Sequence, residues 1–143
     1  MPLGLSRASQ YAVRALVHLA RLPPHAAATV HAISDAEGIP EPFLAKVVRR
    51  LVSEGYVASF RGPGGGMRLA RDPESISVMD VMSCVDGADP FSGCFLGMPK
   101  CNEDAPCAMH HSWAPMREKL QSDLARTSIA SLASLGEMRA MSG

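Results

Sequence analysis

The sequence predicts a mainly helical fold with one small β-hairpin, and three observations support this prediction. Segments with apolar residues at helical spacing fill most of the chain, separated by Gly and Pro. Two short β-type runs, residues 56–60 and 67–70, flank a glycine-rich turn. A long helical segment near the C-terminus carries an apolar seam. The chain has 143 residues, 47% of them hydrophobic but only 5% aromatic, so we expect a core of small aliphatic side chains and Met.

Three helices are predicted before the hairpin. Residues 6–22 contain neither Gly nor Pro, begin with a Ser, and carry apolar residues at helical spacing, until two prolines stop the helix. A short helix over residues 30–37 ends at Gly38, which suits a left-handed C-terminal position. Pro40 and Pro42 open a third helix, which ends before Gly55.

The third helix has a polar side opposite its apolar stripe. That side carries Pro42, Ala45, Lys46, Arg49 and Ser53. Two short helices joined by a Gly turn, the second with a basic face, are typical of a DNA-binding helix-turn-helix. A merely solvated helix face is the alternative interpretation of this segment alone.

The hairpin favours the DNA-binding interpretation. Four glycines and a proline lie within residues 61–66, so the backbone of this turn can approach a flat surface closely. Arg61 and Arg68 flank the turn with positive charge. A hairpin directly after a helix-turn-helix is a wing, which can reach the DNA backbone or minor groove. The rival interpretation, a phosphate-binding loop of a nucleotide enzyme, is weak because no Lys-Ser/Thr pair follows the glycines.

Charge and hydropathy agree with a DNA partner for the first half of the chain. Residues 1–75 hold nine Lys and Arg against six Asp and Glu, whereas residues 76–143 hold five against eight.

Neither a signal peptide nor a membrane-spanning run is apparent, so a cytoplasmic location without membrane contact is expected. Cysteines in that compartment more often bind metals or react as redox groups than form structural disulfides. No catalytic constellation stands out, which argues against an enzyme.

The second half begins and ends with predicted helices. Residues 77–85 form a short helix on which Cys84 is expected to be a buried, inert thiol. Ser112 is expected to cap a long helix that reaches about Thr127. Its apolar seam consists of Met109, Trp113, Met116, Leu120 and Leu124. Such a seam favours a homodimer, with packing on the chain's own domain as the alternative. A final short helix holds Ile129, Leu132 and Leu135.

Between these helices lies a segment rich in Gly, Pro and Asp that contains three more cysteines. Its ligand-type residues are Cys94, Cys101, Cys107 and His110. The segment has too little apolar surface to order itself by burial. Thiolates and imidazole are the donors that zinc or iron–sulfur clusters select, so the segment is predicted to bind a metal cofactor.

At this point the chain resembles the bacterial winged-helix iron–sulfur transcription regulators typified by IscR and NsrR, over roughly residues 5–135. The matching pieces are Leu5-Ser6, Tyr11-Ala12-Val13, Gly38-Ile39, Leu44, the run from Arg61 to Gly66, Val85-Asp86 and the triplet Cys94, Cys101 and Cys107. The resemblance implies a homodimeric regulator whose binding to an operator in double-stranded DNA depends on an iron–sulfur cluster. A 2Fe–2S cluster is favoured, and a 4Fe–4S cluster is the alternative.

The resemblance also implies functional residues. In IscR the fourth cluster ligand is a histidine separated from the last cysteine by two residues, which corresponds to His110, with His111 as the less favoured neighbour. In NsrR it is an aspartate of the first helix, where this chain has Gln10, a poor ligand. The expected DNA contacts are Arg7, Pro42, Lys46, Arg49, Arg61, Gly62, Pro63 and Gly64.

The predicted organisation is a winged helix-turn-helix domain over residues 1–75, followed by a cluster-binding loop and dimerisation helices over residues 76–143. The function expected is transcriptional regulation in response to redox state, nitric oxide or iron. Two alternatives stay open: a regulator that senses through cysteine oxidation or zinc without a cluster, and a redox protein without a regulatory role.

Overall fold

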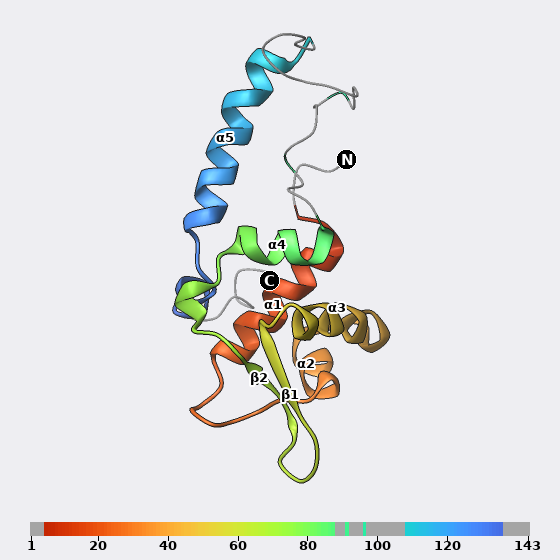
Figure 1. The fold of residues 1–143 in the computed structure, drawn as a ribbon. Coiled ribbons are helices and arrows are strands. Elements are labelled where there is room, and N and C mark those ends of the chain that lie inside the picture. The colour runs from red at the N-terminus through yellow and green to blue at the C-terminus, as the bar shows by residue number, and fades with distance from the viewer. Residues whose placement is uncertain (1–4, 88–90, 92–95, 97–107, 136–143) are drawn as a thin grey trace.

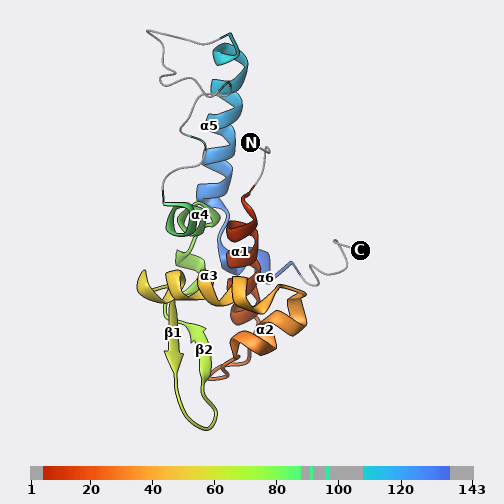
Figure 2. The same cartoon turned by 90° about the vertical axis from the view of Figure 1, so that its right-hand side faces the viewer.

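The computed structural model describes residues 5–87, 91, 96 and 108–135 (Figure 1). Within these residues the fold is mainly helical with a two-stranded antiparallel hairpin, as predicted. The elements, in chain order, are α1 (Arg7–Ala20), α2 (Val30–Glu37), α3 (Glu41–Ser53), β1 (Val57–Phe60), β2 (Gly66–Leu69), a 3₁₀ turn (Pro73–Ser75), α4 (Val78–Asp86), α5 (His110–Arg126) and α6 (Ile129–Ala133). In Figures 1 and 2, α2, α3 and the hairpin occupy one end of the molecule, and α5 extends away from them past α4.

The ends of the first helices follow from local side-chain chemistry. The Ser6 hydroxyl accepts a hydrogen bond from the Ser9 backbone N–H at 3.1 Å, which caps the start of α1. Thr29 caps α2 in the same way, and Gly38 ends α2 in the left-handed conformation, with φ +66°. The sequence therefore predicts these boundaries to within one or two residues.

The helix-turn-helix is held against α1 by burial and by a charged contact. Leu16 on α1, Ile33 on α2 and Leu44 on α3 are each fully buried in the shared core. His18 Nδ1 lies 3.2 Å from Glu37 Oε2, which fastens the last turn of α2 to α1. Together these contacts fix the orientation of α2 and α3 relative to α1.

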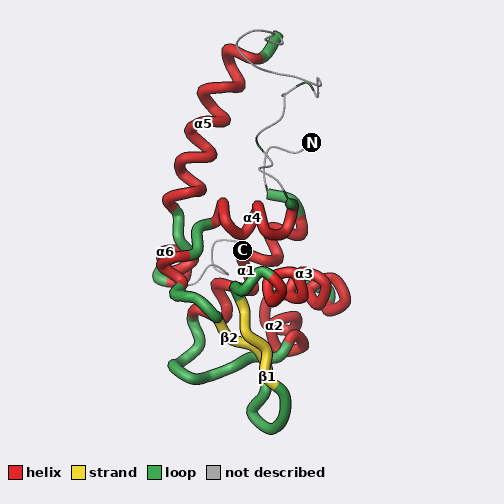
Figure 3. Tube along the Cα trace, in the orientation of Figure 1, coloured by secondary structure: helices red, strands yellow, loops and turns green. Residues whose placement is uncertain are grey.

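The hairpin pairs Val57 with Leu69 and Phe60 with Gly66 at its two ends. Its second strand also forms a bridge to Ala28, in which the Met67 N–H donates to the Ala28 carbonyl oxygen at 2.7 Å. The hairpin is thereby joined to the segment that enters α2, as the loop tube in Figure 3 shows beside the strands. The wing is attached to the helix-turn-helix by main-chain hydrogen bonds as well as by its covalent connection to α3.

The start of helix α4 (Val78–Asp86) is fixed by local capping and by hydrogen bonds to another part of the fold. Ser77 and Asp80 form a reciprocal capping box at its start. Just beside this cap, the Val78 N–H donates to the Thr127 carbonyl at 2.9 Å and the Ile129 N–H donates to the Ile76 carbonyl at 2.8 Å. The start of α4 is therefore hydrogen-bonded to the junction between α5 and α6.

One expectation about α5 needs correction. The sequence predicts Ser112 as the helix cap and His110 on the preceding loop, whereas the helix begins at His110 with Met109 in the N-cap position and without a side-chain cap. The apolar seam is also divided: Trp113 is buried, but Met116 is 54% exposed and Leu120 is 37% exposed. No helix within the described part of the chain is long and apolar enough to cross a membrane.

Candidate nucleic-acid interface and metal site

Helix α3 separates its apolar and polar residues as its sequence predicts. Leu44, Val47 and Leu51 are buried against the core, whereas Lys46 and Arg49 are exposed. Pro42, another predicted DNA contact, is exposed in the first turn of the helix. Arg49 on this face lines a groove together with residues of the hairpin.

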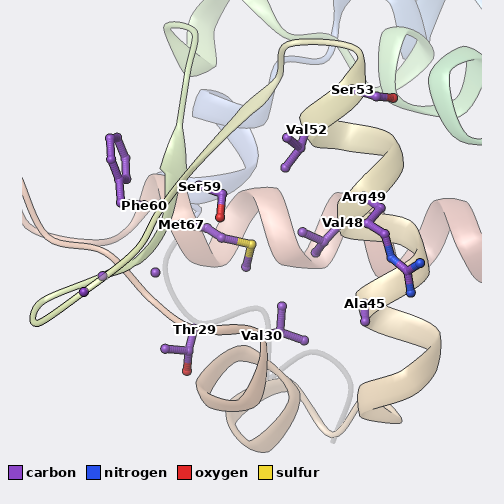
Figure 4. Close-up of a pocket in the computed structure, with 13 residues that line it drawn as sticks. Thr29, Val30, Ala45, Val48, Arg49, Val52, Ser53, Ser59, Phe60 and Met67 are labelled. Atoms are coloured by element: carbon purple, nitrogen blue, oxygen red, sulfur yellow. The ribbon is translucent and has the colours of Figure 1, made fainter.

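A groove of about 650 Å³ lies between α3, the start of α2 and the hairpin. Figure 4 shows Val48 and Val52 on α3 facing Met67 on β2 across this groove, with Val30 near its other side. Thr29, Ser53 and Ser59 place hydroxyl groups around it, and Arg49 supplies a positive charge. Among the described residues that line the groove there is no Asp or Glu. Arg49 and the hydroxyl groups at the edge of this groove are of the types that contact DNA phosphates.

The hairpin presents its glycine-rich tip and its arginines to solvent. Gly62 and Gly64 have φ values of +92° and +74°, and each adopts a conformation that L-residues rarely take. Arg61 and Pro63 are exposed at the tip. On the strands behind it, the Arg68 guanidinium carbon lies 4.3 Å from the centroid of the Phe60 ring, which holds this side chain against the hairpin.

The remaining predicted DNA contact, Arg7, is the first residue of α1 and is exposed. It lies one helical turn before Tyr11, whose ring contacts Phe43 in the first turn of α3. The basic groups predicted to meet DNA thus come from α1, α3 and the hairpin.

The predicted metal site lies largely outside the described residues. This applies to Cys94, Cys101 and Cys107. His110, the fourth predicted ligand, is 3% exposed at the first position of α5, whereas His111 is exposed, and their ring centroids are 5.6 Å apart. Within the described part of the chain, no group of three His, Cys, Asp or Glu side chains converges on a metal position. The donor set of three thiols and a sheltered imidazole fits a zinc ion or an iron–sulfur cluster.

Gln10 on α1 makes a hydrogen bond close to its own position in the chain. Its Nε2 donates to the Leu5 carbonyl at 3.2 Å, within the start of α1.

Cys84 is buried, as predicted, with 8% of its surface exposed. Its Sγ lies 3.9 Å from the Arg50 carbonyl oxygen. Burial raises the pKa of the thiol, Glu54 raises it further, and Arg50 and Arg71 act in the opposite direction. The protonated form is therefore favoured, and it is a weak nucleophile and a weak ligand.

Two polar residues near Cys84 are structurally important but are not among the predicted site residues. Arg50 Nε donates to the Cys84 carbonyl at 3.0 Å. Asp86 accepts hydrogen bonds from the Ser6 and Ser9 hydroxyls, each at 2.9 Å. The partners of Arg50 and Asp86 are far away in the sequence, so no local pattern predicts these hydrogen bonds. The sequence near each residue shows only that it lies on an amphipathic helix.

The structure combines a helix-turn-helix that has an exposed basic helix, a glycine-tipped wing, and a groove between them to which Arg49 adds a positive charge. These features define a winged-helix DNA-binding protein. The family model of Rrf2, described as an iron-dependent transcriptional regulator, matches residues 5–134. The chain therefore belongs to the Rrf2 family of DNA-binding transcriptional regulators, and the prediction that it is not an enzyme is confirmed by this membership.

Individual relatives agree with this assignment. A helix-turn-helix transcriptional regulator of Aquifex aeolicus is 36% identical over 130 residues, which cover 90% of each chain. The transcriptional regulator IscR of Klebsiella pneumoniae is 32% identical over 139 residues, which cover 97% of this chain and 85% of that protein. Among solved structures, CymR, the global cysteine regulator of Bacillus subtilis, superposes with a TM-score of 0.80 at 25% identity, covering 95% of this chain and 100% of CymR.

Proposed function

We propose that this regulator is a homodimer whose affinity for its operator is controlled by an iron–sulfur cluster bound through Cys94, Cys101, Cys107 and His110. The observation that carries the proposal is the position of His110. Its imidazole is sheltered, at 3% exposure, and follows the last cysteine of the triplet by three positions at the start of α5. A sheltered imidazole that closely follows a cysteine in the sequence is suited to act as a cluster ligand together with the thiolates.

The similarity to IscR supports the cofactor assignment. IscR of Klebsiella pneumoniae is 32% identical, and the family model is described as iron-dependent. When bound, an iron–sulfur cluster supplies a centre that reacts with oxidants and nitric oxide and requires iron. We favour a 2Fe–2S cluster, with a 4Fe–4S cluster as the alternative, and a cytoplasmic location.

Residues 1–75 form the proposed DNA-binding domain and residues 76–143 the cluster-binding and dimerisation part. Arg7, Lys46, Arg49 and Arg61 neutralise phosphates, while Pro42 and the residues Gly62, Pro63 and Gly64 allow close contact with the duplex. The exposed Met116 and Leu120 of α5 offer an apolar surface to a second copy. A homodimer formed through this surface would bring two winged domains to one operator.

The link between cofactor and DNA runs through helix α4 and helix α5, which flank the cysteine segment. The last residue of α4 in the structure is Asp86 and the first of α5 is His110. Cys94 and His110 would hold the cluster from the two sides of this segment, and would so restrain the separation of these helix ends. Because α4 packs on α1 and α3, such a restraint would change the fit of α3 to the major groove.

The test is anaerobic purification, with absorbance and electron paramagnetic resonance spectra, iron and sulfide counts, and DNA binding by cluster-loaded and cluster-free protein. We expect visible absorbance, iron with acid-labile sulfide, and a difference in operator affinity between the two forms. Replacing Cys94, Cys101 and Cys107 together by Ser should abolish all three results, whereas the control Cys84→Ser should abolish none. Zinc without sulfide, or thiol-dependent binding without metal, would replace the proposal with one of its alternatives.

A further inference from the structure

The C-terminal end of α4 is fastened to α3 by a side chain of α3 itself. Arg50 Nε donates to the main-chain carbonyl of Cys84 at 3.0 Å. In return, the Cys84 Sγ approaches the Arg50 carbonyl oxygen at 3.9 Å. Residues 34 positions apart in the sequence are thereby joined at the last turn of α4.

The same end of α4 is also fastened to α1. The Asp86 carboxylate accepts hydrogen bonds from the Ser6 hydroxyl at 2.9 and 3.0 Å and from the Ser9 hydroxyl at 2.9 Å. Ser9 is fully buried, so its hydroxyl depends on this contact to satisfy its hydrogen-bonding capacity. The negative charge of Asp86 also lies at the N-terminus of α1, where the helix dipole favours it.

Arg50 differs from its neighbour Arg49 in what it contacts. Arg49 lines the groove between α3 and the hairpin, whereas Arg50 is turned about 100° around the helix axis and reaches α4. Two adjacent arginines on one helix therefore have separate partners. Arg49 faces the proposed DNA surface, and Arg50 faces the protein.

We infer that Arg50 and Asp86 are positioning residues for DNA recognition: they lock α4 to α3 and α1, and so hold α3 at the angle that the operator requires. At its other end, α4 is hydrogen-bonded to the junction of α5 and α6 through Val78 and Thr127. Helix α4 thus connects α5 to α3, the DNA-binding helix, and to α1, against which α3 packs. Where the proposed function holds, this connection also carries the effect of the cluster to α3, and this extension rests on that proposal.

The first test compares Arg50→Gln with the matched control Arg49→Gln in the full-length protein. The probes are a duplex that the wild-type protein selects in vitro and an unrelated duplex of equal length. Arg49→Gln should reduce the salt slope of binding by about 0.9 because one phosphate contact is lost. Arg50→Gln should keep the wild-type slope, but should weaken binding of the selected duplex by about 2- to 30-fold while sparing the unrelated one.

For Asp86→Asn, two explanations of the role of Asp86 predict opposite changes in DNA affinity. If Asp86 acted only through its charge, its removal would relieve repulsion of phosphates and strengthen binding to both duplexes. As a positioning residue, its replacement should instead weaken binding of the selected duplex alone. A general loss of folded protein would lower both affinities equally, and thermal unfolding of each variant measures that loss directly.

The outcomes separate this inference from the proposed function. A lower salt slope for Arg50→Gln, or wild-type discrimination between the duplexes in both Arg50→Gln and Asp86→Asn, overturns the inference. If Arg50→Gln does not fold, the binding of the two duplexes is compared instead in Arg50→Lys and Asp86→Asn. If cluster-loaded and cluster-free wild-type protein bind equally well, the proposed function fails, but the comparison of duplexes still decides the role of Arg50 and Asp86.

Discussion

The ring of Tyr11 meets the ring of Phe43 edge to face, with an interplanar angle of 90° and centroids 5.1 Å apart. This contact joins the second turn of α1 to the first turn of α3. Phe43 is 37% exposed, so the pair lies at the border between the core and the proposed DNA surface. Edge-to-face aromatic pairs contribute about 0.5–1.5 kcal/mol beyond the area they bury.

A double-mutant cycle on this pair should therefore detect coupling. We expect Tyr11→Leu and Phe43→Leu together to show a coupling free energy of about 0.5–1.5 kcal/mol in urea unfolding at a fixed protein concentration. As the control, Tyr11→Leu combined with Phe60→Leu, on the hairpin, should be additive within about 0.5 kcal/mol. Additivity in both pairs would show that the ring contact does not stabilise the fold.

Gly66 should be sensitive to substitution because its position leaves no room for a Cβ atom. A Cβ atom there would lie 2.8 Å from the Ala28 carbonyl oxygen and 2.9 Å from its carbonyl carbon, and the φ value is +143°. We expect Gly66→Ala to destabilise the protein by about 2–4 kcal/mol in thermal or urea unfolding, because it disrupts the bridge to Ala28.

Gly64→Ala is the matched control for this prediction. Its φ value of +74° is also unfavourable for Ala, but a Cβ there meets no atom within 4 Å. The control should therefore lose only about 1 kcal/mol, from backbone strain alone. Equal losses for Gly64→Ala and Gly66→Ala would mean that the bridge to Ala28 contributes little to stability.

Much of the fold is predictable from the sequence because the relevant signals are local. Ser6 and Gly38 act within one turn of the helix that each one bounds, and the glycines of the hairpin mark its tip directly. The start of α5 is different, since it has no side-chain cap and a Ser two residues inside the helix misleads the prediction. Periodicity also cannot show which seam residues the protein's own core covers, and here it covers Trp113.

The positioning contacts of the DNA-binding helices could not be predicted from the sequence. Arg50 is bonded to a carbonyl 34 residues away, and Asp86 to a hydroxyl 77 residues away. Nothing near either residue indicates such a partner. Among the exposed basic residues of α3, only the folded chain distinguishes Arg50, which contacts α4, from Arg49, which lines the groove.

Cys84 should make the stability depend on pH in the alkaline range. Burial raises the pKa of its thiol above the ordinary value of 9.0, so the folded state holds this proton more tightly than the unfolded chain does. The resulting contribution to stability is fully present below the unfolded pKa and is lost as the pH rises through the folded pKa.

The free energy of unfolding should therefore fall more steeply above roughly pH 9 in the wild type than in Cys84→Ala. Other groups titrate in both proteins, so their effects cancel in the comparison. The measurement is urea unfolding at several pH values with a reductant present. Parallel curves for the two proteins would show that Cys84 has the same pKa in the folded and unfolded states.

The exposed apolar residues of α5 should be required for dimer formation. Leu120→Asp places a charge on the seam beside Met116, and we expect it to weaken dimerisation by at least about tenfold, that is by 1.4 kcal/mol. Sedimentation velocity over a range of concentrations measures this shift. Ser122→Asp adds the same charge to an exposed position on another side of α5 and should leave the dimer intact. Dimers of unchanged affinity in Leu120→Asp would exclude this seam as the interface.

His110 and His111 offer a neighbouring pair in which only one member is sheltered. With His110 at 3% exposure and His111 exposed, we expect His110→Ala to lose iron or shift the visible spectrum of anaerobic protein, and His111→Ala to leave the spectrum nearly intact. Both variants keep the three cysteines, so a difference between them indicates which of the two imidazoles contributes to cluster binding. The reverse result would assign the ligand to His111. Identical spectra in both variants and the wild type would mean that neither imidazole binds iron, and that the fourth ligand comes from another residue or from solvent.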